Sequence, residues 1–288
     1  MILFNVNISM PYKFGNKTYD LFSHTYIMGI LNITPDSFSD GGKYFDEDIL
    51  LQKIIVDAVV MEKEGADFID VGGESTRPGS RKISADEEMH RVIPVISEIK
   101  KHISIPISID TYKSEVADEA LKAGAVIVND ISGFQFDHKM AEVTSKHNAS
   151  CILMHIKGTP QNMQINPSYD NVVSEIKDYL SQSISIAKDA GIDQIIVDPG
   201  IGFGKSFYHN IEIIKRLSEF KSLGYPILLG LSKKRFINEI YKSTTDERAV
   251  GTMAANVFGI INGANILRVH NVLENKRTAI TADVFKQL

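Results

Sequence analysis

The chain has 288 residues, of which 43% are hydrophobic and 23% charged, and its formal net charge at pH 7 is −5. This composition is typical of a globular protein with a sizeable core, and the negative charge argues against nucleic-acid or membrane partners. The single cysteine, Cys151, lies in the apolar segment CILMH and is interpreted as a buried hydrophobic residue rather than a nucleophile. Because one cysteine cannot form an internal disulfide, we expect a reducing compartment and a cytoplasmic location.

The first residues, MILFNVNISMPYKFGN, have neither a basic lead nor an apolar segment of signal-peptide length. They alternate weakly between apolar and polar side chains and turn around Pro11 and Gly15. This pattern predicts a short hairpin within an N-terminal extension, residues 1–24. No run of about 18 apolar residues occurs, so the sequence predicts no membrane span.

From residue 25 onward one pattern recurs along the chain. An amphipathic helical stretch ends at a glycine, a short apolar run follows, and a polar residue then begins a loop. Glycine after a helix supplies a left-handed cap, and an apolar run between such breaks is typical of a buried parallel strand. The predicted strands lie near residues 27–31, 68–72, 105–110, 125–130, 150–155, 194–198, 226–230 and 265–270.

Eight such strands with helices between them predict an α/β fold, a (β/α)8 TIM barrel at residues 25–288 preceded by the short N-terminal hairpin. An open, doubly wound sheet is the alternative that this pattern leaves. No linker rich in Pro, Ser or Gly divides the segment, which indicates one barrel domain.

The first predicted strand leads into a loop with the chemistry of a metal or phosphate site. The stretch MGILNITPDSFSDGG, residues 28–42, is apolar up to Asn32 and then rich in carboxylates and hydroxyls. Such groups at the end of a buried strand suit a hard cation or a phosphate. An ordinary solvated turn would have a similar composition.

Polar residues also end the other predicted strands, where the functional residues of a barrel lie. Each alone could be a cap on its loop, but together they would meet at one mouth. The residues at these ends are Asn32, Asp70, Asp110, Asn129, Asp130, His155, Asp198, Arg268 and His270, with Gly230 before LSKKRF.

These residues divide into two half-pockets. Short acceptors and amides at 110, 129 and 198 could pair with a flat heterocycle that carries a guanidine-like edge. The cations and histidine of the second group suit a phosphate. The second group comprises Lys234, Arg268 and His270, with Arg77 on the second loop.

The segment VDPGIGFGKS resembles a phosphate-binding P-loop but does not match it. Only three residues separate Gly200 from Gly204, and Pro199 holds the place of the first glycine. We therefore interpret the glycines as allowing the loop to run close over a ligand.

Several segments of the chain, in order, resemble the dihydropteroate synthase family, which joins a pterin to 4-aminobenzoate. The resemblance begins near Thr25 and runs to the C-terminus. It rests on the motifs MGILNITPDSFSDGG, DVGGESTRPGS, ISIDTYKSEVA, VNDISG, LMHIKGTPQNMQ, DPGIGFGK, LSKKRF and RVHNV.

This resemblance implies roles for the matching residues. Asn32 resembles the family's ligand to Mg2+, which also holds the pyrophosphate. Arg268 and His270 resemble the residues that hold the pyrophosphate oxygens and, with Asn32 and Lys234, form the implied catalytic group. The resemblance also implies that the pterin is bound by Asp110, Asn129, Asp198 and Lys234, and 4-aminobenzoate by Thr76, Arg77, Pro78 and Ser232, with Met154 and Phe203 as apolar walls.

The implied reaction is displacement of pyrophosphate from 6-hydroxymethyl-7,8-dihydropterin diphosphate by the amine of 4-aminobenzoate. An aromatic amine is already neutral at pH 7, and no nucleophile–base pair stands out in the sequence, so we favour a dissociative, SN1-like course. The resemblance further implies Mg2+ as cofactor, a homodimer and a sulfonamide target. One position departs from the family's usual Ser-Arg-Lys, where this chain has Lys233 in place of the arginine. The positive charge is kept, but the planar guanidinium becomes a point charge.

Two other functions are considered. A methyltetrahydrofolate-dependent methyltransferase domain has a similar barrel and pterin pocket, but it has no use for the acidic first loop or for STRPG. A catalytically silent pterin-binding protein would be expected to lack Asn32, Thr76, Lys234 or His270, and all four are present.

Overall fold

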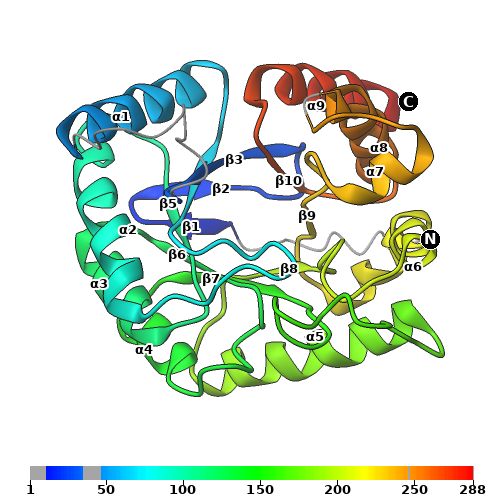
Figure 1. Cartoon of the computed structure of the whole chain (residues 1–288), viewed down its shortest axis with the longest axis horizontal. Coiled ribbons are helices and arrows are strands. Elements are labelled where there is room, and N and C mark those ends of the chain that lie inside the picture. Colours follow the sequence, from blue (N-terminus) through cyan, green and yellow to red (C-terminus); the bar gives the residue numbers. More distant parts are fainter. Residues whose placement is uncertain (1–10, 35–46, 246, 288) are drawn as a thin grey trace, which may run out of the picture.

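The computed structural model describes residues 11–34, 47–245 and 247–287, and these form a (β/α)8 barrel with a short antiparallel hairpin before it (Figure 1). Both features were predicted from the sequence. The hairpin pairs β1 (Tyr12–Phe14) with β2 (Lys17–Tyr19). The division of the chain into an extension, 1–24, and a barrel domain, 25–288, stays a prediction.

The barrel strands are all parallel and neighbours in space follow the chain order, as in β8-β7-β6-β5-β4-β3-β10-β9. Their bounds are β3 (Tyr26–Asn32), β4 (Phe68–Gly72), β5 (Ile107–Asp110), β6 (Ile127–Asp130), β7 (Ser150–Met154), β8 (Ile195–Asp198), β9 (Leu228–Leu229) and β10 (Ile266–Val269).

The barrel closes between β8 and β9 at an isolated bridge, which we call the seam. Val197 pairs with Ile227, and the N–H of Val197 donates to Pro226 O at 2.9 Å. Proline has no N–H to return a hydrogen bond, and the N–H of Ile227 donates instead to the Asn265 side chain at 2.9 Å. The sequence around Pro226 therefore keeps this junction short.

Helices surround the barrel on the outside (Figure 1). They are α1 (Glu47–Lys63), α2 (Ala85–Ile99), α3 (Ser114–Ala123), α4 (Met140–Lys146), α5 (Val172–Asp189), α6 (Phe207–Lys215), α7 (Arg235–Ile240), α8 (Arg248–Ile261) and α9 (Val272–Gln287), with a 3-10 helix, η2 (Leu217–Leu223), after α6. The glycines at 65, 124, 191, 224 and 263 all have positive φ, as the predicted caps require. No helix in the described ranges is long and apolar enough to cross a membrane.

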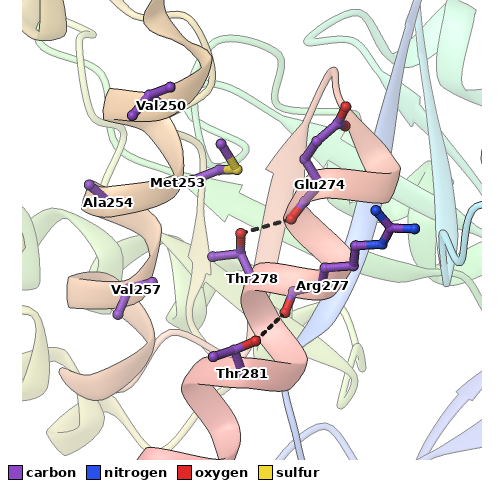
Figure 2. A pocket seen from close by; sticks show the side chains of 8 residues that line it. All are labelled: Val250, Met253, Ala254, Val257, Glu274, Arg277, Thr278 and Thr281. Carbon is purple, nitrogen blue, oxygen red and sulfur yellow. Dashed lines mark hydrogen bonds between the residues drawn. The ribbon is translucent and has the colours of Figure 1, made fainter.

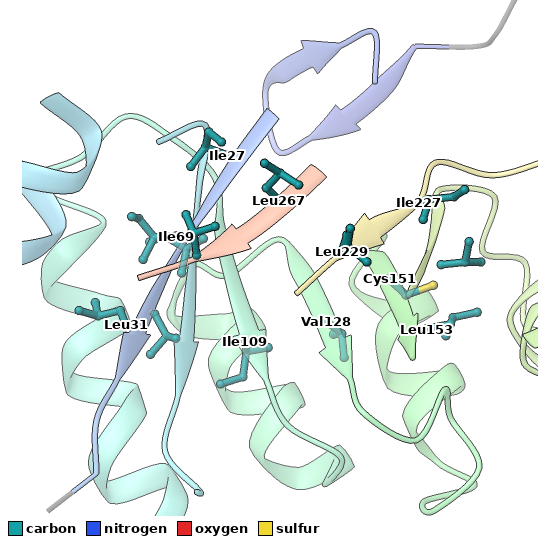
Figure 3. Close-up of a cluster of buried hydrophobic side chains, with 14 of the residues drawn as sticks. Ile27, Leu31, Ile69, Ile109, Val128, Cys151, Leu153, Ile227, Leu229 and Leu267 are labelled. Carbon is teal, nitrogen blue, oxygen red and sulfur yellow. The ribbon is translucent and has the colours of Figure 1, made fainter. Parts of the chain in front are cut away.

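Two of the three apolar clusters in the described part of the chain follow from the alternation of side chains along each strand. The larger one lies between strands and helices and includes Ile27, Ile69 and Cys151, which is a free, fully buried cysteine (Figure 3). The smaller one combines inward side chains such as Met28 and Phe68 with aromatic residues of the hairpin. The hairpin thus covers the amino-terminal end of the bore, which leaves the carboxyl end as the entrance to the bore.

Candidate active site at the carboxyl ends of the strands

The register of three neighbouring strand pairs brings a row of polar side chains to the carboxyl end of the barrel. Asn32 lies opposite Gly72, Gly72 opposite Asp110, and Asp110 opposite Asn129. A Cβ on Gly72 would lie 3.5 Å from Oδ1 of Asn32 and 3.5 Å from Cβ of Asp110. Glycine at this position therefore leaves space between the two polar side chains.

Arg268 crosses the bore from β10 and joins the two predicted half-pockets. Its Nη2 donates to Oδ2 of Asp110 at 2.7 Å, and its Nε donates to Oδ2 of Asp70 at 2.6 Å. The amide of Asn129 donates to the same Asp70 oxygen at 2.9 Å. The expected separation into an acceptor half and a cationic half is therefore incomplete, because Arg268 is bonded to a residue of the acceptor half.

Burial and the neighbouring charges change the pKa values of Asp110 and Arg268 in the bore. Burial raises the pKa of Asp110 to about 7; the charge of Arg268 opposes the shift and that of Asp70 adds to it. Burial also disfavours the charged guanidinium of Arg268, but the two carboxylates outweigh it and raise its pKa. Arg268 consequently stays charged and holds Asp110 through a direct ion pair.

Asp198 and Lys234 carry opposite charges in the pocket, and each affects the titration of the other. Asp198 lies opposite Met154 in the β7–β8 register. Burial raises the pKa of Asp198 against the charge of Lys234, and burial lowers the pKa of Lys234 to about 8 against the charge of Asp198. The ammonium of Lys234 also lies 4.5 Å from the centre of the Phe203 ring, a cation–π distance. The apolar walls predicted at Met154 and Phe203 thus adjoin the charged pair.

The loop after β8 carries the glycines of VDPGIGFGKS, and two of them come close to protein backbone. The N–H of Gly200 donates to Oδ1 of Asp198 at 2.7 Å. A Cβ on Gly200, whose φ is +69°, would lie 1.9 Å from the backbone oxygen of His155, and a Cβ on Gly204 would lie 2.5 Å from that of Lys157. Gly200 and Gly204 therefore pack the loop against the segment that follows β7, and the close approach of the loop to a ligand stays a prediction.

Ser232 and His270 lie together at the ends of β9 and β10. Ser232 Oγ lies 2.9 Å from Nδ1 of His270 and accepts the backbone N–H of His270 at 3.2 Å. Burial lowers the pKa of His270 to about 4. Nearby cations reinforce the shift, namely Arg268, Lys233, Arg77 and Lys234. Because these cations surround one imidazole, this end of the pocket suits a multiply charged anion.

The second loop places its predicted residues at the open edge of this cationic group. Thr76 is half-buried, whereas Arg77 and Pro78 are exposed. The N–H of Gly79 donates to Pro160 O at 3.2 Å, which ties the loop to the segment after β7. The first loop is described only up to Thr34; Asp36 and Asp40 lie outside the described residues.

Two polar strand-end residues serve local structure instead of the pocket. His155 is buried against Tyr179 of α5, with a ring-centroid distance of 4.7 Å. Asp130 accepts hydrogen bonds from the backbone of Ser132 and Phe134 in its own loop, at 2.7 and 3.0 Å. Both follow an inward-facing residue, so alternation along the strand directs them away from the bore.

Two buried charged residues near the pocket, Asp70 and Lys205, were not predicted from the sequence to have a role in the site. Asp70 was noted as a strand end, but it received no role, although it holds both Arg268 and Asn129. Lys205 is buried behind the pocket, with Nζ 2.7 Å from Nδ1 of His155 and donating to Phe203 O at 2.9 Å. Burial lowers the pKa of Lys205 well below its ordinary value. An acid inside the apolar strand FIDVG was the available signal for Asp70.

The oxygen atoms near Asn32 could supply only part of the ligand shell of a magnesium ion. No group of three His, Cys, Asp or Glu side chains that could hold a metal occurs among the described residues. Asn32 is half-buried, and Gly72 leaves space between its side-chain oxygen and Asp110. Mg2+ commonly takes one or two protein oxygens and completes its shell with phosphate and water, so a neutral amide oxygen next to a phosphate site fits such an ion.

Comparisons with known proteins agree with this geometry. Residues 28–270 match the family model described as pterin binding enzyme. Dihydropteroate synthase of Clostridium beijerinckii is 48% identical over 275 residues, which cover 94% of this chain and 98% of the relative.

Two solved structures also resemble the chain closely. The Yersinia pestis dihydropteroate synthase in complex with a sulfonamide drug matches with a TM-score of 0.90 and 36% identity, over 97% of this chain and 100% of that one. The Xanthomonas albilineans enzyme in complex with 7,8-dihydropteroate matches with a TM-score of 0.86 and 32% identity, over 97% of this chain and 100% of that one.

Proposed function

The chain belongs to the dihydropteroate synthase family of pterin-binding enzymes, and from this we propose the reaction and the residues that carry it. The protein is a transferase of folate biosynthesis. It condenses 6-hydroxymethyl-7,8-dihydropterin diphosphate with 4-aminobenzoate to give 7,8-dihydropteroate and pyrophosphate. The observation that carries the proposal is the pocket in which buried acceptors adjoin a group of cations at the carboxyl end of the barrel.

The pterin binds among the acceptors of the bore. Asp198 is a buried carboxylate on β8, Asp110 is a partly buried one on β5, and Asn129 lies beside Asp110 in the register. One carboxylate pairs with the guanidine-like edge of the pterin, and the others meet the remaining ring nitrogens. Met154 and Phe203 bound the ring plane, and Lys234, above Phe203, adds a donor.

The diphosphate binds at the cationic group. Arg268 and Lys234 supply positive charge, and His270 supplies a hydrogen bond. Because Ser232 Oγ accepts the backbone N–H of His270 and can donate to its Nδ1, the ring proton is assigned to Nε2, where it can face the anion. Thr76, Arg77 and Pro78 cover the 4-aminobenzoate at the open edge, with Ser232 on the opposite loop.

Magnesium is the proposed cofactor, with Asn32 as its protein ligand among the described residues. When bound, the ion would neutralise diphosphate charge and make pyrophosphate a better leaving group. The protein residues share that task, because the nearby cations stabilise the negative charge that develops on the departing group.

The displacement follows a dissociative course. The electron-rich dihydropterin stabilises positive charge on its methylene as the bond to pyrophosphate breaks. The carboxylates around the ring favour that charge, and the second loop holds the neutral amine of 4-aminobenzoate near the methylene. No described residue has to act as a strong base, because the amine loses its proton only after the new bond forms.

One experiment tests this function directly. The purified protein is incubated with the pterin diphosphate, 4-aminobenzoate and Mg2+, and dihydropteroate and pyrophosphate are measured. Equal amounts of both products are expected. Pyrophosphate release without dihydropteroate would contradict the proposal, and a sulfonamide should compete with 4-aminobenzoate in the same assay.

We also propose a homodimer that forms through α8 and α9. Exposed apolar side chains lie on both helices, among them Val250 on α8 and Phe285 on α9, which are 71% and 67% exposed. Figure 2 shows a groove between these helices with Glu274 and Arg277 on its α9 side. A two-fold axis would bring opposite charges and apolar faces of two copies together. Val250→Asp with Phe285→Asp should yield a monomer in sedimentation experiments.

A cytoplasmic location is the last part of the proposal. Cys151 is buried with a free thiol, and burial raises its pKa. The fold therefore uses no disulfide through this residue, as expected in a reducing compartment. Fractionation of cells that produce the protein would test the location.

A further inference from the structure

Asp70 is a buried carboxylate to which the proposed function assigns no substrate contact. It is fully buried on β4, and its Oδ2 accepts hydrogen bonds from Nε of Arg268 at 2.6 Å and from Nδ2 of Asn129 at 2.9 Å. Within the described ranges Oδ1 has no hydrogen-bond partner. Burial of such a charge is costly unless an opposite charge is held close to it, and Arg268 is that charge.

Arg268 uses two different nitrogens on two carboxylates that differ in accessibility. Nε bonds to Asp70, whose side chain is 0% exposed, and Nη2 bonds to Asp110, whose side chain is 14% exposed. A ligand that enters from the mouth of the barrel therefore meets the bond to Asp110 first. The bond to Asp70 lies deeper and is closed to it.

The bond to Asp110 conflicts with the proposed roles of both partners. Asp110 is needed for the ring of the pterin, and Arg268 is needed for the diphosphate, yet the two bond to each other at 2.7 Å. The donors of the pterin edge and Nη2 of Arg268 compete for the same carboxylate. Once the pterin occupies Asp110, Nη2 needs another acceptor, and the diphosphate supplies one.

We propose that Asp70 is a positioning residue, a fixed pivot that retains Nε of Arg268 while Nη2 passes from Asp110 to the diphosphate of the substrate. This inference rests on the proposed function and adds to it a reason for the order of events. When the pterin ring binds Asp110, it frees Nη2 of Arg268 from that carboxylate. Nη2 then donates to the diphosphate and strengthens the binding of the leaving group. Asp70 touches no substrate and acts through Arg268.

The inference predicts positive coupling between two fragments of the substrate in the wild-type protein. 6-Hydroxymethylpterin, which lacks the diphosphate, should raise the affinity for inorganic pyrophosphate severalfold in the presence of Mg2+. In Asp110→Asn the acceptor is weaker and Nη2 is released in advance. Pyrophosphate should therefore bind more tightly to that variant alone, and the pterin fragment should add little. Isothermal titration calorimetry measures all four affinities.

Removal of the pivot should have the opposite effect. Asp70→Asn keeps the shape but not the charge, so Arg268 stays with Asp110, and pyrophosphate affinity should fall about ten- to a hundredfold, the range for hydrogen bonds to charged groups. Ser108→Ala is the matched control, because Ser108 is also fully buried, lies opposite Asp70 in the β4–β5 register, and has a hydroxyl without a partner in the described part of the chain. Its pyrophosphate affinity should equal that of the wild type.

A double-mutant cycle separates positioning from a general structural effect. In an Arg268→Gln background, Asp70→Asn should cause no further loss of pyrophosphate affinity, because Asp70 acts only through the arginine. Additive losses would overturn the inference, and so would an absence of coupling between 6-hydroxymethylpterin and pyrophosphate in the wild type. The wild-type titration stands even if Asp70→Asn does not fold. Failure of the proposed function would appear separately, as a wild-type protein that forms no dihydropteroate.

Discussion

Ser232, on the loop after β9, contacts His270, which directly follows β10, with Oγ of the serine 2.9 Å from Nδ1 of the histidine. The same oxygen accepts the backbone N–H of His270 at 3.2 Å. One hydroxyl thus fixes both the backbone and the ring of a residue at the cationic end of the pocket. The orientation of His270 therefore depends on a neighbour from a different loop, the one that follows β9.

Ser232→Ala should weaken pyrophosphate binding, because the ring of His270 then loses the partner that directs its Nε2 proton toward the anion. The loss expected for a neutral hydrogen bond is about 1 kcal/mol, or roughly fivefold in affinity. Calorimetric titration with pyrophosphate and Mg2+ measures it. Ser222→Ala, on the exposed side of η2, is the control. Equal affinities of the two variants would exclude the role given to Ser232.

Asp198→Asn should lower the affinity for the pterin ring. The amide would present donors to the donors of the pterin edge and leave buried groups unpaired, at a cost of about 2–5 kcal/mol of binding free energy. Calorimetry with 6-hydroxymethylpterin measures this directly. An unchanged affinity would remove Asp198 from the pterin site.

Asn32→Ala should weaken the apparent affinity for Mg2+ in the steady-state assay, because an oxygen ligand is lost beside the phosphate site. The apparent constant is read from activity against Mg2+ concentration at saturating substrates. Asn271→Ala is a suitable control, since this half-buried asparagine follows His270 without belonging to the proposed metal ligands. If Asn32→Ala titrates like the wild type, the metal has other ligands.

Pyrophosphate should raise the affinity for 4-aminobenzoate severalfold in the presence of the pterin ring. The second loop, Ser75–Ser80, carries the exposed Arg77, which can close upon the anion. Ordering a loop costs roughly 1–2 kcal/mol per fixed residue, more than a ligand as small as 4-aminobenzoate would supply alone. Equilibrium binding of labelled 4-aminobenzoate with and without pyrophosphate and Mg2+ tests this. Identical affinities would mean that the second pocket is already formed.

The stability of the protein should fall in mild acid because of His155. Burial lowers its pKa from 6.5 to about 2, with the charge of Lys205 adding to the shift. Below pH 6.5 the unfolded chain therefore binds a proton that the native protein does not. From pH 6.5 to pH 5 this contributes a loss of up to about 2 kcal/mol in the free energy of unfolding.

Urea denaturation at several pH values measures that loss. His155→Gln should show a shallower dependence on pH than the wild type, whereas His90→Gln, at an exposed position, should retain the wild-type slope. A slope unchanged by His155→Gln would show that His155 does not carry the effect.

Local patterns were enough to predict the barrel and the hairpin. The alternation of apolar runs and amphipathic stretches ending at glycines such as Gly124 reports burial and backbone conformation, which depend on near neighbours in the chain. The same patterns could not assign partners across the bore. The bond between Arg268 and Asp110 depends on the relative heights of strands that lie far apart in sequence, and sequence reasoning placed these residues in separate half-pockets.

The sequence also could not predict whether a given side chain at a strand end points into the bore or toward the helices. Met154 and His155 are adjacent, and a shift of one residue in the expected strand decides which of them lines the bore. Asp70 lies inside β4 and not at its end, so it reads as one polar residue in an apolar run. Its importance follows only from the two donors, Arg268 and Asn129, that converge on one of its oxygens.

The seam between β8 and β9 is a single bridge, whereas every other pair of neighbouring barrel strands shares at least two residue pairs. Asp198 stands on one side of this seam, and Ser232 and Lys234 stand on the other. A substrate whose ring is held by Asp198 and whose diphosphate is held by Lys234 therefore contacts both sides of the seam. We therefore expect bound substrate to reinforce the single bridge at Val197 and Ile227 and to stabilise the closed barrel.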